Sequence, residues 1–369
     1  MKKTVAFTGG GTAGHVFPGL AVWRELESLA AESGTELDLV WLGSRKGMEK
    51  GILKGEGIPY RGFFSGKLRR YFSFQNFLDL FRLAAGFTGA FFYLLRKKPD
   101  ILFSKGGFVS VPPVAAAGLL GIPVFVHESD ADPGLATRIG SRFARRILVS
   151  YPETRDCFPP ARRELVTVTG NPVREAVYRG NRQRGRELLG LDDSTPLLLV
   201  LGGSQGALQV NLLVEALAPE LVRHGRILHQ MGSLTFKESS LPGYETRDFI
   251  RDELPDFMAA ADLVLGRAGA ATLWELAVLG KPMVLIPLGT GSSRGDQLRN
   301  ARIFERRGAA RVFQGEVNPG ELGRTLTELL TSPELRKKMG EASASLAGDK
   351  PGRTIAGLIM DFLARGKEE

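Results

Sequence analysis

Cysteine and long apolar runs are both scarce in this chain of 369 residues. The single cysteine, Cys157, excludes an intramolecular disulfide and any metal site built from several cysteines. The apolar run at 5–7, behind a basic start, is too short for a secretory signal. The uncharged run at 83–95 has 13 residues, whereas a membrane-spanning helix needs about 20. We therefore expect neither a signal peptide nor a spanning helix.

Acidic residues are scarce in one segment, residues 61–98, where eight lysines and arginines stand against Asp79 alone. This segment supplies most of the excess of 49 − 40 = 9 positive charges in the chain, and it also holds eleven aromatic residues. Basic residues around exposed aromatics are typical of a surface that lies on an anionic membrane. The alternative is an ordinary core helix followed by a basic loop. No recognised nucleic-acid motif accompanies the charge, so we expect no nucleic-acid partner.

Glycine, by contrast, is abundant, and it follows two short apolar strands. Residues 197–201 read as a buried strand, and the glycines of 202–206 lead from it into an amphipathic helix. A helix N-terminus after such a turn presents free N–H groups that suit a phosphate. The same plan occurs earlier in the chain, where residues 4–8 read as a strand and residues 9–14 form a glycine turn. The turn matches G-x-G-x-x-G. A dinucleotide site would also need an acidic residue after the second strand, where the chain has Gly43-Ser44-Arg45.

A second repeat supports two similar halves. Residues 100–127 and 262–287 each read as strand, glycine turn, helix, Gly-x-Pro and strand. Two α/β halves, each a doubly wound parallel sheet, explain this plan, and their strand ends are expected to face each other across a cleft. We place the domains at 1–165 and 166–348, and we expect the apolar helix in 349–369 to pack back on the first domain.

Six stretches of the chain resemble the motifs of one family, MurG, the undecaprenyl-diphospho-muramoylpentapeptide β-N-acetylglucosaminyltransferases of glycosyltransferase family 28. The six stretches are residues 10–18, 127–130, 170–174, 202–207, 267–275 and 296–301. The resemblance implies a GT-B fold of two Rossmann-like domains, the first for the acceptor and the membrane, the second for UDP-GlcNAc. It also implies a peripheral enzyme on the cytoplasmic membrane face, with a part in peptidoglycan synthesis, cell shape and cell division.

The implied reaction moves GlcNAc from UDP-GlcNAc to the 4-hydroxyl of the muramoyl sugar of lipid I, with inversion, and makes lipid II. We expect neither a cofactor nor a metal. Inverting transfer needs a base for the acceptor hydroxyl. His15 lies at a helix start after a glycine turn and titrates near neutrality, and the resemblance makes it the favoured base. Glu128 and Asp130 follow a strand and offer alternative carboxylates.

The resemblance also implies the substrate contacts. Arg174 is expected at the donor diphosphate, Ser204 at the phosphates, Glu275 at the ribose, the Ile250 backbone at uracil and Gln297 at the donor sugar. Thr12, Ala13 and Gly14 are expected to meet the reacting sugar and the acceptor diphosphate. The remaining expected substrate contacts are Asp130, Ala270, Ala271 and Thr272. The chain departs from a common family pattern at Asp130 and Asp296, where many relatives have Asn and Gln.

Asp130-Ala131-Asp132 also has the D-x-D form of metal-binding glycosyltransferases of another architecture. We interpret these residues instead as the cap of a helix that begins near Pro133. Three alternatives to lipid I transfer stay open: a diacylglycerol glycosyltransferase of the same fold, a UDP-GlcNAc 2-epimerase, and a silent sugar-nucleotide binder. The epimerase would turn over the sugar nucleotide without an acceptor.

Overall fold

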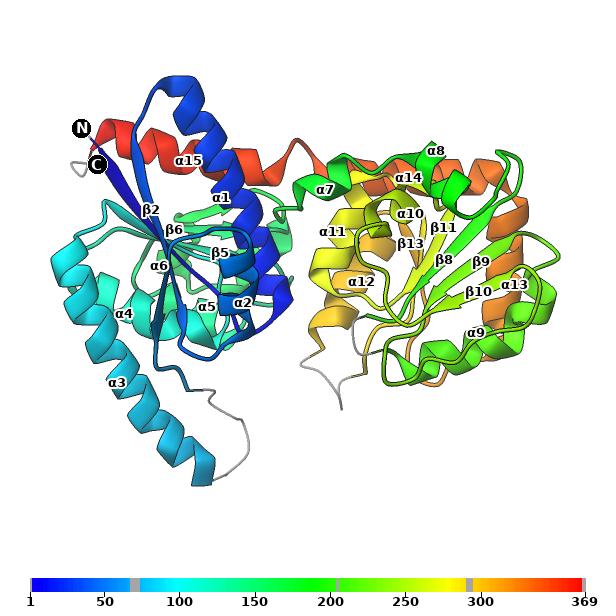
Figure 1. Ribbon diagram of the computed structural model, residues 1–369, viewed down its shortest axis with the longest axis horizontal. Coiled ribbons are helices and arrows are strands. Elements are labelled where there is room, and N and C mark those ends of the chain that lie inside the picture. The colour runs from blue at the N-terminus through cyan, green and yellow to red at the C-terminus, as the bar shows by residue number, and fades with distance from the viewer. Residues whose placement is uncertain (1, 67–73, 204–205, 290–294, 367–369) are drawn as a thin grey trace. The chain divides into compact units, whose positions relative to one another are not determined.

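The computed structural model describes residues 2–66, 74–203, 206–289 and 295–366, with only the backbone described at 74–80. The chain divides into two compact units (Figure 1). The N-terminal unit comprises Met1–Val173 and Asp349–Glu369, and the C-terminal unit comprises Arg174–Gly348. Each unit is built on one parallel sheet with helices on both faces.

The sheet of the N-terminal unit has seven parallel strands in the order β3-β2-β1-β4-β5-β6-β7. These strands are β1 (Lys3–Thr8), β2 (Leu37–Ser44), β3 (Tyr60–Phe63), β4 (Ile101–Ser104), β5 (Val124–Glu128), β6 (Ala144–Val149) and β7 (Val166–Val168). Its helices are α1 (Ala13–Ser33), α2 (Met48–Gly55), α3 (Phe74–Lys97), η1 (Phe108–Ser110), α4 (Val111–Leu119), α5 (Leu135–Gly140), η2 (Pro152–Cys157), α6 (Pro160–Arg163) and α15 (Pro351–Arg365).

The sheet of the C-terminal unit has six parallel strands in the order β10-β9-β8-β11-β12-β13. They are β8 (Leu197–Leu201), β9 (Arg226–Gln230), β10 (Tyr244–Arg247), β11 (Leu263–Gly266), β12 (Met283–Leu285) and β13 (Ala310–Val312). The helices are α7 (Glu175–Tyr178), α8 (Arg182–Leu188), α9 (Leu208–Leu221), α10 (Leu254–Ala260), α11 (Ala270–Val278), α12 (Asp296–Arg306), α13 (Pro319–Thr331) and α14 (Pro333–Ala347).

Both sheets reverse their strand order at one point, between β1 and β4 in the first and between β8 and β11 in the second. In doubly wound sheets, ligands bind outside the carboxyl ends of the strands at such a switch point. The loops at 9–12 and 105–107 follow β1 and β4. Those at 202–207 and 267–269 follow β8 and β11. The two glycine loops singled out in the sequence therefore each lie at the switch point of their own sheet.

Continuous apolar strands explain why both sheets are covered on two faces. Every residue of β4 and β8 is buried, as expected for central parallel strands. In the N-terminal unit, Phe7, Trp23 and Trp41 pack together on one face, with ring centroids of Phe7 5.0 Å from Trp23 and 5.8 Å from Trp41. Helix α15 completes this face through buried Ile355, Ala356, Ile359 and Leu363. It packs against α1 (Figure 1).

The boundary between the units lies after the predicted position of 165/166. Strand β7 pairs with β6 in the N-terminal sheet, with Ile147 opposite Val166, so residues 166–173 belong to the first unit. The alternating Val166-Thr167-Val168 supplies a seventh, edge strand, whereas the prediction had used it to open the second domain. The C-terminal unit begins only at Arg174.

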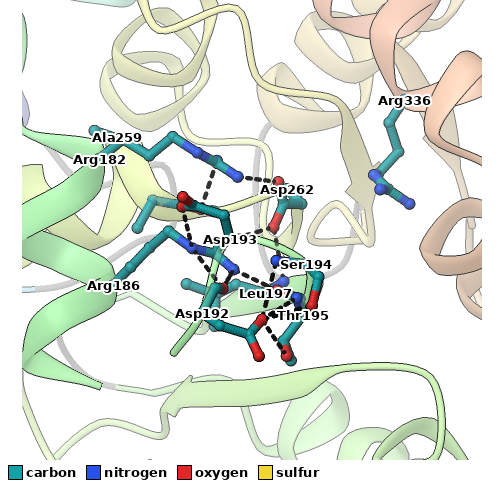
Figure 2. Close-up of polar contacts among 12 residues, drawn as sticks. Arg182, Arg186, Asp192, Asp193, Ser194, Thr195, Leu197, Ala259, Asp262 and Arg336 are labelled. Carbon is teal, nitrogen blue, oxygen red and sulfur yellow. Dashed lines mark hydrogen bonds and ion pairs between the residues drawn. The ribbon is translucent and has the colours of Figure 1, made fainter. Parts of the chain in front are cut away.

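One carboxylate anchors the start of the C-terminal unit to its sheet (Figure 2). Asp262 lies just before β11. Its Oδ1 accepts a hydrogen bond from Arg182 at 2.8 Å, and its second oxygen, Oδ2, accepts one from Arg186 at 3.3 Å. Its second oxygen also accepts the N–H of Leu197, the first residue of β8, at 2.9 Å. Since Arg186 is only 2% exposed, losing this carboxylate would remove the shorter of its two ion pairs and leave Asp193, at 3.6 Å, as its remaining carboxylate. The contact lies at the amino ends of the strands and leaves the carboxyl ends to the candidate site.

Candidate active site

His15 lies at the switch point of the N-terminal sheet, in the first turn of α1. The loop after β4 packs on its ring. A Cβ atom at Gly107, where φ is +80°, would lie 2.2 Å from the Gly10 carbonyl oxygen and 2.9 Å from His15 Cδ2. Only glycine permits this close approach. The predicted acceptor contacts Thr12, Ala13 and Gly14 immediately precede His15, and Thr12 and Gly14 are exposed.

A buried carboxylate that the sequence analysis did not single out supports this glycine loop. Glu49, at the start of α2, is fully buried. Its Oε2 accepts the N–H of Gly11 at 3.2 Å, and its Oε1 accepts the N–H of Ser44 at 2.8 Å. A buried carboxylate needs such donors, so Glu49 holds the turn after β1 to the end of β2. No spacing or motif in the sequence indicates this role.

Glu128 is committed to the loop that follows β5. Its Oε1 accepts the N–H groups of Ser129 at 2.9 Å and Asp130 at 3.1 Å, and its Oε2 accepts that of Gly134 at 2.9 Å. The residue is 4% exposed. The predicted cap by Asp130-Ala131-Asp132 is therefore wrong, because α5 begins at Leu135 with Gly134 as its N-cap, and Glu128 receives the Gly134 N–H.

The D-x-D segment has other partners as well. Asp132 forms an ion pair with Arg138 at 2.9 Å. Among the residues that the structure describes, no group of three or more His, Cys, Asp or Glu side chains could hold a metal ion.

In the C-terminal unit, Arg174 and Glu275 form an ion pair. Arg174 Nε donates to Glu275 Oε1 at 2.7 Å, and the two side chains are 30% and 11% exposed. Glu275 lies on α11, the helix that follows β11 at the switch point. The predicted contacts Ala270, Ala271 and Thr272 form the first turn of the same helix, where backbone N–H groups lack intrahelical acceptors. The structure thus joins two residues that were predicted as separate donor contacts.

Ile250 and Gln297, two further predicted donor contacts, are bonded to segments at the carboxyl ends of strands of the same unit. The N–H of Ile250 donates to Gln230 Oε1 at 2.9 Å, and Gln230 ends β9, so this glutamine positions the segment without having been predicted. Gln297 Oε1 accepts the N–H of Leu288 at 3.1 Å, which ties α12 to the loop after β12. Ser204 lies outside the described residues.

Comparison with known proteins identifies the family. The glycosyltransferase family 28 N-terminal domain matches residues 5–149, and the family 28 C-terminal domain matches residues 197–350. The chain is 46% identical over 394 residues to the UDP-N-acetylglucosamine–N-acetylmuramyl-(pentapeptide) pyrophosphoryl-undecaprenol N-acetylglucosamine transferase of Treponema denticola, with all of both chains covered.

Two further relatives agree. A Bacillus cereus transferase of the same name, number 2, is 44% identical, with 91% of this chain and 94% of the relative covered. The crystal structure of Acinetobacter baumannii MurG is similar with a TM-score of 0.75 and 28% identity, over 98% of this chain and 100% of that one. The predicted α/β fold of the GT-B class, with two Rossmann-like units, is confirmed. This chain therefore belongs to glycosyltransferase family 28, and it is a glycosyltransferase.

Proposed function

We propose that this enzyme transfers GlcNAc from UDP-GlcNAc to the C4 hydroxyl of the MurNAc of lipid I, with inversion, and so makes lipid II for the cell wall. The observation that carries this proposal is the 46% identity, over all of both chains, to a transferase whose name states this donor sugar and this lipid-linked acceptor.

In this proposal the C-terminal unit binds the donor. Arg174 meets the diphosphate, because a guanidinium forks onto phosphate oxygens, and Glu275 accepts from the ribose hydroxyls. The first turn of α11, at Ala270, Ala271 and Thr272, offers N–H groups to the leaving diphosphate. Gln297 contacts the sugar. Since the Ile250 N–H is already bonded to Gln230, we assign the Ile250 carbonyl to the N3–H of uracil.

The N-terminal unit supplies the acceptor site and the base. The neutral imidazole of His15 removes the proton of the C4 hydroxyl while that oxygen forms a bond to C1 of GlcNAc. The bond from C1 to the β-phosphate oxygen breaks on the opposite face, and its electron pair leaves with UDP. We assign the acceptor diphosphate to Thr12, Ala13 and Gly14. Glu128 has three backbone donors, which supports a positioning task for it and the base role for His15.

We further propose that α3 rests on the anionic cytoplasmic face of the cell membrane. Phe81, Phe92 and Leu95 are 60%, 63% and 45% exposed, and residues 81, 85, 88, 92 and 95 recur at the spacing of one helix face. Arg82 and Arg96 are exposed beside them. An apolar stripe flanked by arginines suits a membrane surface. No helix among the described residues is long and apolar enough to cross a membrane.

One lysine of the predicted membrane segment has a partner within the N-terminal unit. Lys97 forms an ion pair at 2.6 Å with Asp38 of β2, so part of its charge is directed to the sheet. Arg69 and Arg70 lie outside the described residues.

The decisive experiment measures UDP release from UDP-GlcNAc in the presence of a chelator, with and without a short-chain lipid I analogue. We expect release that requires the acceptor and survives chelation. A His15→Ala variant should lose at least a hundredfold in kcat while it still binds UDP-GlcNAc. Release with diacylglycerol in place of the analogue would indicate the related lipid glycosyltransferase. Epimerisation or UDP release without any acceptor would contradict the proposal.

A further inference from the structure

A lysine is buried in the interior of the N-terminal unit, at the carboxyl end of β4. Lys105 is 1% exposed, and its Nζ donates to Ser129 Oγ at 2.5 Å. A buried ammonium is costly unless it is paired, and lysine is rarely found fully buried for this reason. None of the functional roles described above uses this side chain.

The contact continues into a short chain of hydrogen bonds. Ser129 Oγ donates to Asn171 Oδ1 at 2.7 Å, and Asn171 is wholly buried. Next to it, His127 Nε2 donates to the Gly170 carbonyl at 2.9 Å. Lys105, Ser129 and Asn171 therefore tie together the end of β4, the loop after β5 and the segment after β7. The hydrogen bonds run in one direction, since Lys105 donates to Ser129 and Ser129 donates to Asn171.

Lys105 is also the first residue of the loop on which His15 packs. Its N–H donates to the Thr8 carbonyl at 2.8 Å, and Gly10 N–H reaches the Gly106 carbonyl at 3.4 Å. A Cβ atom at Gly9 would lie 3.0 Å from Lys105 Cβ. The glycine loop after β1 and the loop 105–107 are thus packed on each other. A shift of the Lys105 side chain would move the surface that confines the His15 ring.

The charges around Lys105 come from the β5 strand and its loop. Burial lowers the pKa of Lys105 to about 8, against the attraction of Glu128 and Asp130, which raises it. Burial, with the charge of Lys105, also lowers the pKa of His127 well below its usual range. The lysine is therefore protonated at neutral pH, while His127 is neutral and serves as a hydrogen-bond donor to Gly170.

We propose that Lys105 is a positioning residue for glycosyl transfer, whose protonated side chain, bonded through Ser129 to Asn171, holds the loop 105–107 against the ring of His15. This inference rests on the proposed function and on His15 as its base. Small errors in the placement of a base lower kcat strongly, whereas the proposed donor contacts lie in the other unit.

The test compares wild type with Lys105→Met, which keeps an unbranched side chain and removes the charge. Acceptor-dependent UDP release is measured at saturating substrates from pH 6.5 to 9.5. We expect kcat of Lys105→Met to be at least tenfold lower at pH 7, with KM for UDP-GlcNAc within twofold of wild type. In wild type, kcat should fall as the pH rises through about 8, and the variant should lack this fall.

Lys281→Met is the matched control. Lys281 is a half-buried lysine whose pKa desolvation also lowers to about 8, but it donates to the carbonyls of Ala259 and Ala261 in the C-terminal unit. Its variant should lose thermal stability and keep the wild-type pH profile of kcat. Unfolded lysines stay protonated up to about pH 10.5, whereas Lys105 and Lys281 lose their protons near pH 8 in the folded chain, so their titration raises stability between pH 8 and 10.5. A fall in kcat over this pH range without a fall in the thermal midpoint therefore reports a change at the site and not a loss of folded protein.

A kcat of Lys105→Met within threefold of wild type, with the same alkaline fall, would overturn the role of Lys105 and leave the proposed function intact. If wild type shows no acceptor-dependent release, the proposed function fails and the role of Lys105 fails with it. Should Lys105→Met not fold, the wild-type profile decides, because a kcat that stays level from pH 7 to 9.5 would contradict a required ammonium.

Discussion

Arg174 Nε lies 2.7 Å from Glu275 Oε1, although the two residues are 101 positions apart in the chain. The carboxylate is the more shielded partner, with 11% of its side chain exposed. Such a charge-assisted contact orients both groups before a ligand arrives. The ion pair therefore presents a cation and a carboxylate in fixed positions to the diphosphate and the ribose of the proposed donor.

Replacing this carboxylate should weaken donor binding. We expect Glu275→Gln to raise KM for UDP-GlcNAc by about 10- to 100-fold, because a hydrogen bond to a charged group contributes about 1.5–3 kcal/mol. KM for the acceptor should stay within about threefold. Glu220→Gln is the control, since Glu220 pairs with Arg223 on the surface of α9. Equal donor KM values in Glu275→Gln and wild type would refute the ribose assignment.

The buried carboxylate of Glu49 should be required for both stability and turnover. Glu49→Gln retains one acceptor oxygen and turns an amide N–H toward a backbone donor, so one of the bonds to Gly11 and Ser44 is lost. We expect a loss of about 1–3 kcal/mol in unfolding free energy and a lower kcat at unchanged donor KM. Glu56→Gln provides the comparison from the opposite end of α2, where the carboxylate is exposed and pairs with Arg24. Wild-type kcat and stability in Glu49→Gln would show that the loop needs no such support.

The exposed phenylalanines of α3 should determine membrane affinity. We expect Phe81→Ser and Phe92→Ser each to weaken binding to vesicles with anionic phospholipid by about tenfold, since burying a phenylalanine contributes about 1.5–3 kcal/mol. Sedimentation with vesicles measures the effect. The control is Phe236→Ser, which removes a phenylalanine of similar character, 45% exposed, from the C-terminal unit. If all three variants bind vesicles as wild type does, α3 is not the membrane surface.

Acid should destabilise the C-terminal unit through a buried histidine. His229 accepts from the Tyr244 hydroxyl at 2.8 Å, donates to Asn211 Oδ1 at 3.0 Å, and burial lowers its pKa to about 4. In the unfolded chain it takes up a proton near pH 6.5. The stability that depends on neutral His229 is thus complete above pH 6.5 and is lost as the pH falls toward 4, by up to roughly 3 kcal/mol.

Hydrogen exchange of β8 and β9 amides between pH 7 and 4.5, corrected for intrinsic rates, measures this loss within the unit. His229→Gln should be less stable at pH 7 and show a smaller pH slope. His224→Gln should keep the wild-type slope, because His224 lies on the surface beside Glu220. A His229→Gln slope equal to that of wild type would assign the acid sensitivity to other groups.

The fold was predictable because its signals are local and repeated. Apolar strands such as Leu197–Leu201, followed by glycine and then an amphipathic helix, indicate a parallel sheet wherever they occur. The repeated plan in residues 100–127 and 262–287 indicated two such sheets. The boundary was harder to predict, since Val166–Val168 fits an edge strand of the first sheet as well as an opening strand of the second. Pairing with β6, a long-range contact, decides between the two.

The candidate site likewise has residues that the sequence indicated and residues that only the structure revealed. Residues in motifs, among them His15, Arg174 and Glu275, were found from the sequence and the family resemblance. Glu49, Lys105 and Gln230 were not, because a lone glutamate, lysine or glutamine carries no pattern that separates it from a surface residue.

The sequence alone thus determined the two doubly wound sheets, their glycine loops and the family, since backbone geometry and side-chain periodicity are properties of neighbouring residues. Only the tertiary structure decided that Arg174 reaches Glu275, that Glu49 supports Gly11, and that Lys105 is buried against Ser129. Each of these contacts joins segments that lie far apart in the chain. The free energy that each contact contributes depends on burial, and the side chains become buried only once the strands have assembled into a sheet.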